Sequence, residues 1–251
     1  MEGNNPFSLE GKTVLVTGAS SGIGKATAIE CSRMGAQVII TGRNMERLNQ
    51  TLSLLDTNLS QNHSLIVADL TKEKDLLHIA DTIGAIDGLV NNAGVNRIKL
   101  SLFVKNEDLE YIFQNNAFPS VNLTRVLLKK KKIAKGGSIV FTSSISAFYN
   151  APGRLLYSGS KAAMTSFMRS FAIELADKHI RANAVHPGMV ETNMTAEHIS
   201  EEELKRNLGE YPLKRYGKPE EIAWAIIYLL SDAAAWVTGS SLTIDGGFML
   251  K

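Results

Sequence analysis

The sequence predicts an α/β protein, a single domain over residues 1–251 built on a doubly wound parallel sheet with helices on both faces. Three observations predict this class. Strand-like and helix-like segments alternate along the chain, with no repeat, low-complexity tract or linker. The strand-like segments are apolar on both faces, which is typical of parallel strands covered by helices on each side. Most clusters of Gly, Ser and Asn follow strands, and the ligand crevice of such a sheet lies at those carboxyl ends.

The amino-terminal half alternates strand and helix. The run TVLVTG (Thr13 to Gly18) is β-branched and ends at glycine, and the helical segment KATAIECSRMG after it closes at Gly35. AQVIITGR is predicted as the second strand, with MERLNQTLSLLDTN as the helix that follows. SLIVADL and EKDLLHIADTIG repeat the pattern, and GLVNNAG is the fourth strand.

The carboxyl-terminal half continues the same alternation. A long helix is predicted from about Asn106 to Lys132, followed by the strand GSIVFTSS and a second long helix opened by YSGSK. IRANAVHPG and SLTIDGG are predicted as the last two strands. The predicted strands therefore number seven, which is enough for a doubly wound sheet.

Pro119 falls inside the first of these long helices. A proline there removes the backbone bond to the carbonyl of Asn115 and crowds that carbonyl. We expect a kink or widened turn between Asn115 and Ser120, with a water held at a freed carbonyl such as that of Asn116. The alternative is that Pro119 marks a helix N-terminus and that a separate short helix precedes it.

The composition excludes several classes of function. Hydrophobic residues make up 44% of the chain and charged residues 21%, as in ordinary globular proteins, and the net charge of +2 is too small for a nucleic-acid footprint. Cys31 is the single cysteine, so no intramolecular disulfide or cysteine metal cluster forms, and we expect it in the core. No signal peptide or run of about twenty apolar residues is present, so we expect a cytoplasmic protein without a membrane partner.

A glycine-rich turn, TGASSGIG, links the first strand to the first helix. We expect Gly18 to permit the tight turn, Gly22 to let the backbone approach a pyrophosphate, and Gly24 to let the helix pack closely on the sheet. A dinucleotide phosphate would then face the positive end of the helix. Three residues separate the first two glycines, so the spacing departs from the general G-x-G-x-x-G fingerprint.

This turn, with NNAG, YSGSK and HPG, closely resembles the short-chain dehydrogenase/reductase family over Lys12 to Gly247. The resemblance implies a Rossmann-like oxidoreductase. The ETNM and GKPEEIA stretches and the VTGSSLTIDGG ending look most like bacterial 3-oxoacyl-(acyl-carrier-protein) reductases of fatty acid biosynthesis. Many sugar, steroid and xenobiotic reductases share these endings.

Tyr157 and Lys161 lie four residues apart, on one face of the predicted helix. A ketone reduction needs a proton at oxygen, and a free tyrosine has a pKa near 10, too high for easy proton exchange at neutral pH. Lowering that pKa by about three units takes roughly 4 kcal/mol. One positive charge at about 4.5 Å supplies a similar energy at an effective dielectric near 20. Lys161 is therefore a source of the shift, to which an oxidised nicotinamide would add.

The resemblance assigns the same roles. It makes Tyr157 the proton donor and Lys161 the residue that tunes it and holds the nicotinamide ribose. It also implies that Ser144 binds the substrate carbonyl, with Ser143 as the competing choice. Asn116 matches the asparagine whose backbone carbonyl anchors a water in a proton relay, and Asn115 is the runner-up.

The second strand indicates the cofactor. An acid at its end would bind the ribose 2′-hydroxyl of NAD, whereas a basic residue accommodates the 2′-phosphate of NADP. Gly42 takes the acid's place and Arg43 follows it, so we expect NADP(H); the alternative is that Arg43 is a solvated loop residue. The resemblance implies no metal, and cofactor contacts at Gly18, Ser20, Ser21, Gly22, Ile23, Gly24, Arg43, Asp69, Leu70, Asn91, Ala93, Gly94, Tyr157, Lys161, Pro187, Gly188, Val190 and Thr192.

The basic run KKKKIAK, Lys129 to Lys135, is predicted to end a long helix, where cations are favourable. The resemblance offers a second interpretation, in which Lys135 and Lys178 dock an acidic acyl carrier protein near the active-site mouth. Both are lysines where arginine is usual, which loses bidentate geometry. The resemblance also implies a substrate lid over Met189 to Tyr211 and a homotetramer built through the two long central helices and the C-terminal segment.

The leading hypothesis is an NADPH-dependent reductase of a 3-oxoacyl thioester. The second is a dehydrogenase of a sugar, polyol or other small alcohol. A third, from another class, is a dinucleotide-sensing protein without catalysis, against which the complete set of Ser144, Tyr157 and Lys161 argues.

Overall fold

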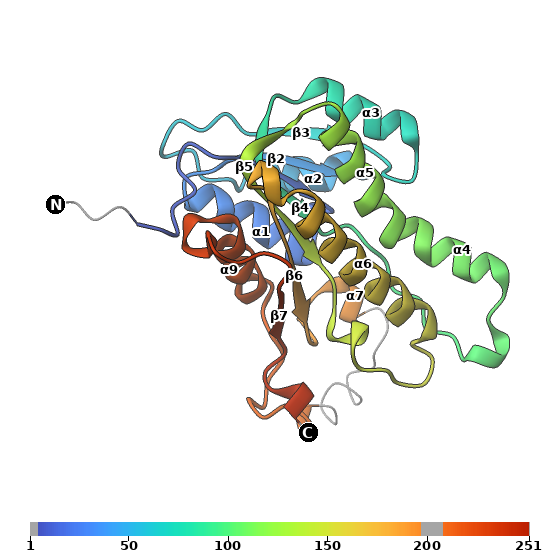
Figure 1. Cartoon of the computed structure of the whole chain (residues 1–251). Helices are drawn as coiled ribbons and strands as arrows, with labels where there is room; N and C mark the ends of the chain where they lie inside the picture. Colours follow the sequence, from blue (N-terminus) through green and yellow to red (C-terminus); the bar gives the residue numbers. More distant parts are fainter. Residues whose placement is uncertain (1–4, 197–207, 251) are drawn as a thin grey trace.

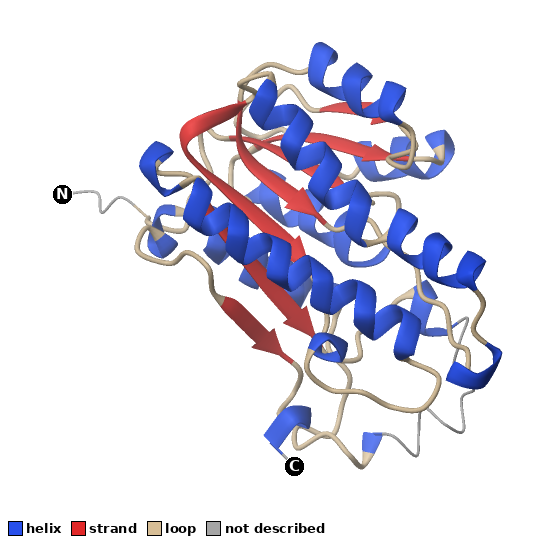
Figure 2. Ribbon diagram, turned by 45° about the vertical axis from the view of Figure 1, so that its right-hand side comes forward, coloured by secondary structure: helices blue, strands red, loops and turns tan. Residues whose placement is uncertain are grey.

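Seven parallel strands form one twisted sheet in the computed structural model, which describes residues 5–196 and 208–250 (Figures 1 and 2). The strands lie in the order β3-β2-β1-β4-β5-β6-β7. Their bounds are β1 Thr13–Thr17, β2 Gln37–Gly42, β3 Ser64–Val67, β4 Ile86–Asn91, β5 Ile133–Thr142, β6 Arg181–Pro187 and β7 Ser241–Ile244. All seven predicted strands are present, and the predicted doubly wound class is confirmed.

Helices cover both faces of the sheet (Figure 2). The helices are α1 Gly22–Arg33, α2 Met45–Leu52, α3 Glu73–Thr82, α4 Asn106–Asn115, α5 Ala117–Lys129, α6 Leu155–Glu174, α7 Asn193–Ala196 and α9 Pro219–Leu230. One apolar core lies between the sheet and α3, α5 and α6, and a second, which contains Cys31, lies between the sheet and α1, α2 and α9. The sequence did not predict α9, although Pro219 stands at its first residue and two glutamates follow.

The chain changes direction at β1. From β1 it proceeds to β2 and β3 on one side, and then returns to place β4 on the other side, where Val14 pairs with Gly88. The carboxyl ends of β1 and β4 thus diverge into helices on opposite faces, and the crevice between them is where doubly wound sheets bind ligands.

The predicted long helix from Asn106 to Lys132 is two helices. Asn116, with φ −114° and ψ −66°, separates α4 from α5. The interruption falls within the predicted interval, and the segments are separate helices, as the alternative expected. Pro119 lies in the first turn of α5, where a missing N–H is tolerated. The water at a freed carbonyl stays a prediction.

The basic run ends this helix as predicted, since Lys129 is the last residue of α5 and Lys130 its C-cap, but the helix stops three residues before the predicted bound at Lys132. Lys131 adopts a left-handed conformation, with φ +55°, and Lys132 N–H donates to the Leu127 carbonyl at 2.8 Å. These features close α5 without the usual glycine, so the sequence lacked the common stop signal. Lys135 lies in β5 instead.

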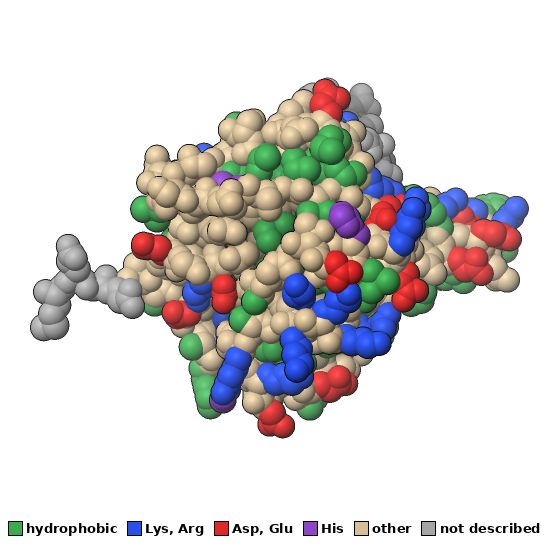
Figure 3. Space-filling model, turned by 90° about the horizontal axis from the view of Figure 1, so that it is seen from above, with side chains coloured by type: hydrophobic (Ala, Val, Ile, Leu, Met, Phe, Trp, Pro, Cys, Tyr) green, Lys and Arg blue, Asp and Glu red, His purple; other side chains and the backbone are tan. Residues whose placement is uncertain are grey.

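Lys135 and Lys178 lie at the amino ends of β5 and β6. Lysine and arginine side chains gather on the face of the molecule seen from above in Figure 3. Within one protomer, the expectation that the two lysines flank the mouth of the ligand crevice is wrong, because the crevice lies at the carboxyl ends of the same strands. No helix in the described part of the chain is long and apolar enough to cross a bilayer.

Candidate active site

A cavity of about 610 Å³ runs along the carboxyl ends of the strands. Its walls come from the segments after β1, β2, β3, β4, β5 and β6, and from the C-terminal segment near Phe248. It therefore spans the switch point between β1 and β4. Segments distributed over most of the chain meet there, and we name three regions of the cavity for the group that each is expected to hold: a phosphate end, an adenosine end and a reaction end.

The glycine turn forms the phosphate end. Gly18 has φ +65° and Gly22 has φ +54°, a left-handed conformation that favours glycine. A Cβ on Gly24 would lie 2.3 Å from the Gly18 carbonyl oxygen, so this glycine lets α1 approach the turn after β1. The Ser21 side chain makes no capping bond to α1, which leaves the N–H groups of the first turn to bind an anion. These residues fit a dinucleotide pyrophosphate.

The adenosine end is basic where NAD-specific sites are acidic. Gly42, Arg43 and Arg47 line it on one side, and Asp69 with Thr71 on the other. Burial raises the pKa of Asp69, but hydrogen bonds from Thr71 and the charges of Lys72 and Arg43 outweigh it, so the carboxyl pKa lies below its usual value. Asp69 is thus an anion on the β3 side of the cavity, and no carboxylate follows β2 directly.

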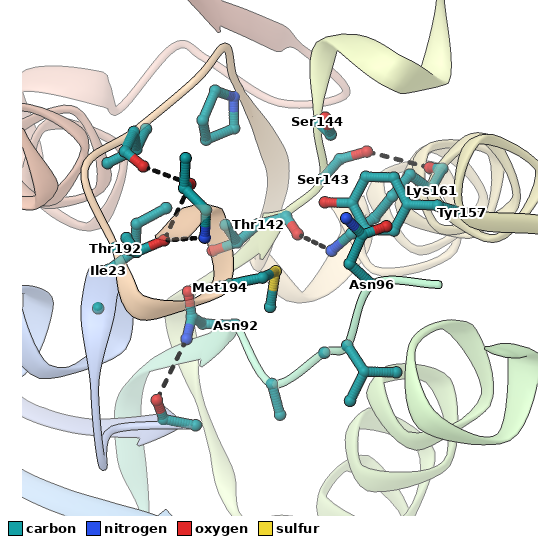
Figure 4. Close-up of a pocket in the computed structure, with 18 of the residues that line it drawn as sticks. Ile23, Asn92, Asn96, Thr142, Ser143, Ser144, Tyr157, Lys161, Thr192 and Met194 are labelled. Atoms are coloured by element: carbon teal, nitrogen blue, oxygen red, sulfur yellow. Dashed lines mark hydrogen bonds between the residues drawn. The ribbon is translucent and has the colours of Figure 1, made fainter. Parts of the chain in front are cut away.

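The reaction end holds Ser144, Tyr157 and Lys161 (Figure 4). Tyr157 and Lys161 come from the first turns of α6, and the ammonium nitrogen lies 5.7 Å from the centroid of the phenol ring. Lys161 Nζ donates to the Thr142 carbonyl at 2.7 Å. Lys161 is buried, which lowers its pKa from 10.5 to about 8.

Tyr157 does not show the lowered pKa that the sequence predicts. Burial raises the pKa of its phenol above the ordinary value, and the Ser144 hydroxyl and the charge of Arg154 oppose this increase without overcoming it. Lys161 is not among the groups that shift it. The spacing of four residues brings the two side chains together, but the ammonium group is directed to the Thr142 carbonyl.

Ser144, and not Ser143, is directed toward Tyr157. Ser143 Oγ bonds the Lys161 carbonyl at 3.0 Å and lies 3.1 Å from Thr165 Oγ1, so it ties β5 to α6. Ser144 Oγ interacts with the Tyr157 phenol and accepts from the Ser146 N–H. The geometry favours Ser144 over Ser143, and the bond from Ser144 to the substrate carbonyl stays a prediction.

His186 holds the backbone of Ser144 in place through a hydrogen bond to its carbonyl. Its ring is fully buried, packs on Phe148 with centroids 4.5 Å apart, and donates from Nδ1 to the Ser144 carbonyl at 3.0 Å. Its Nε2 is buried without a partner among the described residues. Burial, with the charges of Lys161 and Arg169, holds the pKa of His186 below its ordinary value.

Asn116 lies behind the cavity and does not line it. Its side chain is fully buried, accepts from the Val95 N–H at 2.7 Å and donates to the Val95 carbonyl and to Ser160 Oγ. Gly94 lies between Asn116 and Lys161, since a Cβ there would be 3.1 Å from Asn116 Oδ1 and 3.6 Å from Lys161 Nζ. Asn115 does line the cavity. The relay role of the Asn116 carbonyl stays a prediction.

Two predicted cofactor residues do not line the cavity. Asn91 is buried and donates to Thr124 Oγ1 at 3.0 Å, because it is the last inward-facing residue of β4; its neighbour Asn92 lines the cavity. Gly24 packs beneath the turn. The other predicted cofactor residues line the cavity, namely Gly18, Ser20, Ser21, Gly22, Ile23, Arg43, Asp69, Leu70, Ala93, Gly94, Tyr157, Lys161, Pro187, Gly188, Val190 and Thr192.

The sequence missed several lining residues. Arg47 lies four residues beyond Arg43, in the first turn of α2, and Arg154 lies three residues before Tyr157, so their proximity in the sequence carried a signal for both. The aromatic residues Tyr149, Tyr211 and Phe248 meet only through tertiary folding, with Phe248 between the two tyrosines at centroid distances of 5.2 and 5.0 Å. The predicted lid over Met189 to Tyr211 lies partly outside the described residues, which omit 197–207.

Known proteins resemble this chain over nearly its whole length. A family model described as enoyl-(acyl carrier protein) reductase matches residues 18–249. The 3-oxoacyl-(acyl-carrier-protein) reductase FabG of Thermotoga maritima is 39% identical over 246 residues, which cover 96% of this chain and 99% of that protein.

Solved structures with the same fold differ in their substrates. A 7α-hydroxysteroid dehydrogenase complexed with NADH and 7-oxo glycochenodeoxycholic acid has a TM-score of 0.91 and 32% identity, and covers 98% of each chain. A putative 2-deoxy-D-gluconate 3-dehydrogenase from Agrobacterium tumefaciens with bound NADP has a TM-score of 0.89 and 31% identity, and covers 99% of this chain and all of that one.

Proposed function

Because the chain belongs to the short-chain dehydrogenase/reductase family of oxidoreductases, we propose that it reduces the ketone of a 3-oxoacyl thioester to a secondary alcohol with NADPH. The observation that carries this proposal is the convergence of Ser144, Tyr157 and Lys161 on the reaction end of a cavity whose opposite end fits a dinucleotide. The nicotinamide dinucleotide, which the family binds, supplies the hydride when bound.

The side chains at the reaction end divide the remaining work. Ser144 Oγ holds the substrate oxygen, and the Tyr157 hydroxyl donates a proton to it. Because burial keeps the pKa of Tyr157 high, the phenol stays protonated at neutral pH, as a proton donor must. Lys161 holds the nicotinamide ribose, and its ammonium group is kept in place by the Thr142 carbonyl.

The preference for NADPH rests on the adenosine end. Arg43, just after β2, and Arg47, in the first turn of α2, both line the cavity wall, and guanidinium groups bind phosphate bidentately. Because Gly42 has no side chain, no carboxylate is present there to accept a hydrogen bond from a ribose hydroxyl or to repel a phosphate. One structural relative was solved with NADH and another with NADP, so the fold alone does not decide between the two.

The thioester substrate rests on relatives named as 3-oxoacyl-(acyl-carrier-protein) reductases. A sugar-acid dehydrogenase is the second candidate, because one structural relative is named for 2-deoxy-D-gluconate. A pure dinucleotide sensor has no use for the side chains gathered at the reaction end. We also propose a homotetramer, as is usual for this family. In such an assembly, a carrier protein docked at Lys135 and Lys178 would deliver its acyl group to another protomer.

Oxidation of NADPH, measured with acetoacetyl thioesters beside a panel of sugars and sugar acids, tests the proposal. We expect turnover of the thioesters, and loss of most turnover in Tyr157→Phe with NADPH affinity little changed, because the phenol lies at the reaction end. Lys161→Ala should impair both turnover and cofactor binding. Reduction by Tyr157→Phe at near wild-type rates would contradict the assigned role, and turnover of sugar acids alone would favour the second candidate.

A further inference from the structure

Arg154 is a charged group of the reaction end to which the proposed chemistry assigns no role. It lies in the cavity wall and is half-buried at the N-cap of α6. In residues 5–196 and 208–250, no hydrogen-bonding or ion-pair partner of its guanidinium group is present. Glu210 lines the same cavity and does not pair with it.

Arg154 is also close to the reacting atoms. It precedes Tyr157 by three residues at the start of one helix, and residues at this spacing lie on the same side of a helix. Its charge acts on the Tyr157 phenol, which independently indicates proximity. The wall around it is formed by Tyr149 and Ala151 at the end of the cavity away from Arg43. Arg154 therefore lies at the reaction end of the cavity and not at the adenosine end.

An unpaired guanidinium group in a partly buried wall favours an oxygen ligand. Such a group has five donors in a planar fork, and its desolvation is offset only by acceptors that bear negative charge or strong polarity. When Ser144 and Tyr157 hold a substrate by its ketone oxygen, the substrate atoms next to the ketone lie close to the part of the wall that contains Arg154. Bonds from charged donors are stronger than neutral ones, so this contact can decide which ketone is accepted.

We propose that Arg154 is a specificity residue that binds a second oxygen of the substrate, borne on the carbon β to the reduced ketone. Two sources share this chemistry, the carbonyl of a 3-oxoacyl thioester and the carboxylate of a free 3-oxo acid. The inference rests on the ketone reduction proposed above. It adds that a ketone without the second oxygen is a poor substrate.

Three methyl ketones that differ in the second oxygen test this contact. They are the N-acetylcysteamine thioester of acetoacetate, acetoacetate itself, and pentan-2-one, which lacks the second oxygen. In Arg154→Gln, kcat/KM should fall about tenfold for the thioester and about a hundredfold for the carboxylate, and change less than about twofold for pentan-2-one. Arg154→Lys should restore part of the loss with acetoacetate. Arg33→Gln, an exposed arginine on α1 outside the cavity wall, is the control.

An equal loss on all three substrates, or no loss on any, would overturn the proposal. An equal loss accompanied by a higher apparent pKa in the pH profile would mean that Arg154 acts through Tyr157 instead. Titration of acetoacetate into the NADP-bound protein tests the contact without turnover, and Arg154→Gln should weaken that binding about tenfold. Unchanged binding overturns the inference. Absence of turnover in the wild type, with binding weakened as expected, would contradict only the proposed reaction.

Discussion

At the scale of single residues, the buried charge of Lys161 lowers the stability of the folded protein. Its pKa is about 8 in the folded protein, against 10.5 for the exposed group, because burial disfavours the charged form. Below pH 8 the side chain is protonated in both states, so the folded state bears the full cost of the buried charge. This cost fades as the pH rises from 8 toward 10.5, since the unfolded chain then binds more protons.

Lys161→Met should therefore stabilise the protein while it abolishes turnover. We expect the free energy of unfolding at pH 7 to rise by about 2 kcal/mol. The variant no longer carries the cost of a buried charge, and this cost exceeds the value of the lost hydrogen bond to Thr142. Urea unfolding at pH 7 and at pH 9.5 measures it, and the gain should shrink at the higher pH. Lys129→Met, at an exposed position, should change stability by less than about 0.5 kcal/mol. A destabilised Lys161→Met protein would contradict the role of burial.

Arg43 should discriminate between the two nicotinamide cofactors. Arg43→Ala is expected to weaken NADPH binding about tenfold to a hundredfold and NADH binding less than about twofold, because only NADPH carries the 2′-phosphate. Fluorescence titration of both cofactors measures this, with Arg33→Ala on the exposed face of α1 as the control. An equal loss of affinity for both cofactors would mean that Arg43 does not bind the 2′-phosphate.

Gly42 offers the reciprocal change. A Cβ there would meet Leu48 Cδ2 at 3.5 Å and Ser20 Oγ at 3.6 Å, which are ordinary contacts, so the position accepts a side chain. Gly42→Asp should shift the preference toward NADH by repelling the phosphate.

At the scale of elements, Asn116 links the break between α4 and α5 to two other segments. Its three side-chain bonds reach the Val95 backbone in the loop after β4 and Ser160 on α6. Residues outside α4 and α5 therefore stabilise the break between them, and the orientation of α4 depends on these bonds. The same amide lies next to Gly94 and, through it, close to Lys161.

Asn116→Ala should lower the free energy of unfolding by about 2 to 4 kcal/mol, because it removes three bonds of a buried amide and leaves the partly buried Val95 N–H and carbonyl without partners. Asn115→Ala is the matched control. Its half-buried side chain donates to the Tyr111 carbonyl within its own helix, so its loss should cost less than about 1 kcal/mol. Denaturant unfolding of both variants measures the difference. Equal costs would mean that the break is held by Pro119 and the backbone alone.

At the scale of the whole molecule, the basic face and the cavity lie at opposite ends of the sheet. Reversing Lys135 and Lys178 to glutamate should raise the KM for a carrier-bound substrate severalfold, because the exposed charges attract an acidic carrier. A small thioester should be reduced at an unchanged KM, since neither lysine touches the cavity of its own protomer. Steady-state kinetics with both substrates compares the two. Equal effects would mean that the reversals disturb the fold.

The fold was predictable, and most of the predicted cofactor residues line the cavity, since local patterns encode both. Alternating apolar runs and the glycine turn determine strands, helices and the switch point. The errors have physical causes. The end of α5 was placed too late because Lys131 closes the helix in a conformation usually left to glycine, and Asn91 was placed in the cavity although its side chain bonds Thr124 of α5. The raised pKa of Tyr157 and the unpaired Arg154 were not predictable, because burial and missing partners are tertiary properties.

The switch point at β1 has a consequence for how the protein forms. The pairing of Val14 with Gly88, and of later strands beyond it, joins residues distant along the chain, and such contacts form slowly. The cavity walls run from Gly18 to Phe248, so no partly synthesised chain contains the whole ligand site. A ligand that binds only the completed site stabilises it by about 2.7 kcal/mol at a hundred times its dissociation constant. The supply of cofactor should therefore set how long newly made chains resist proteolysis.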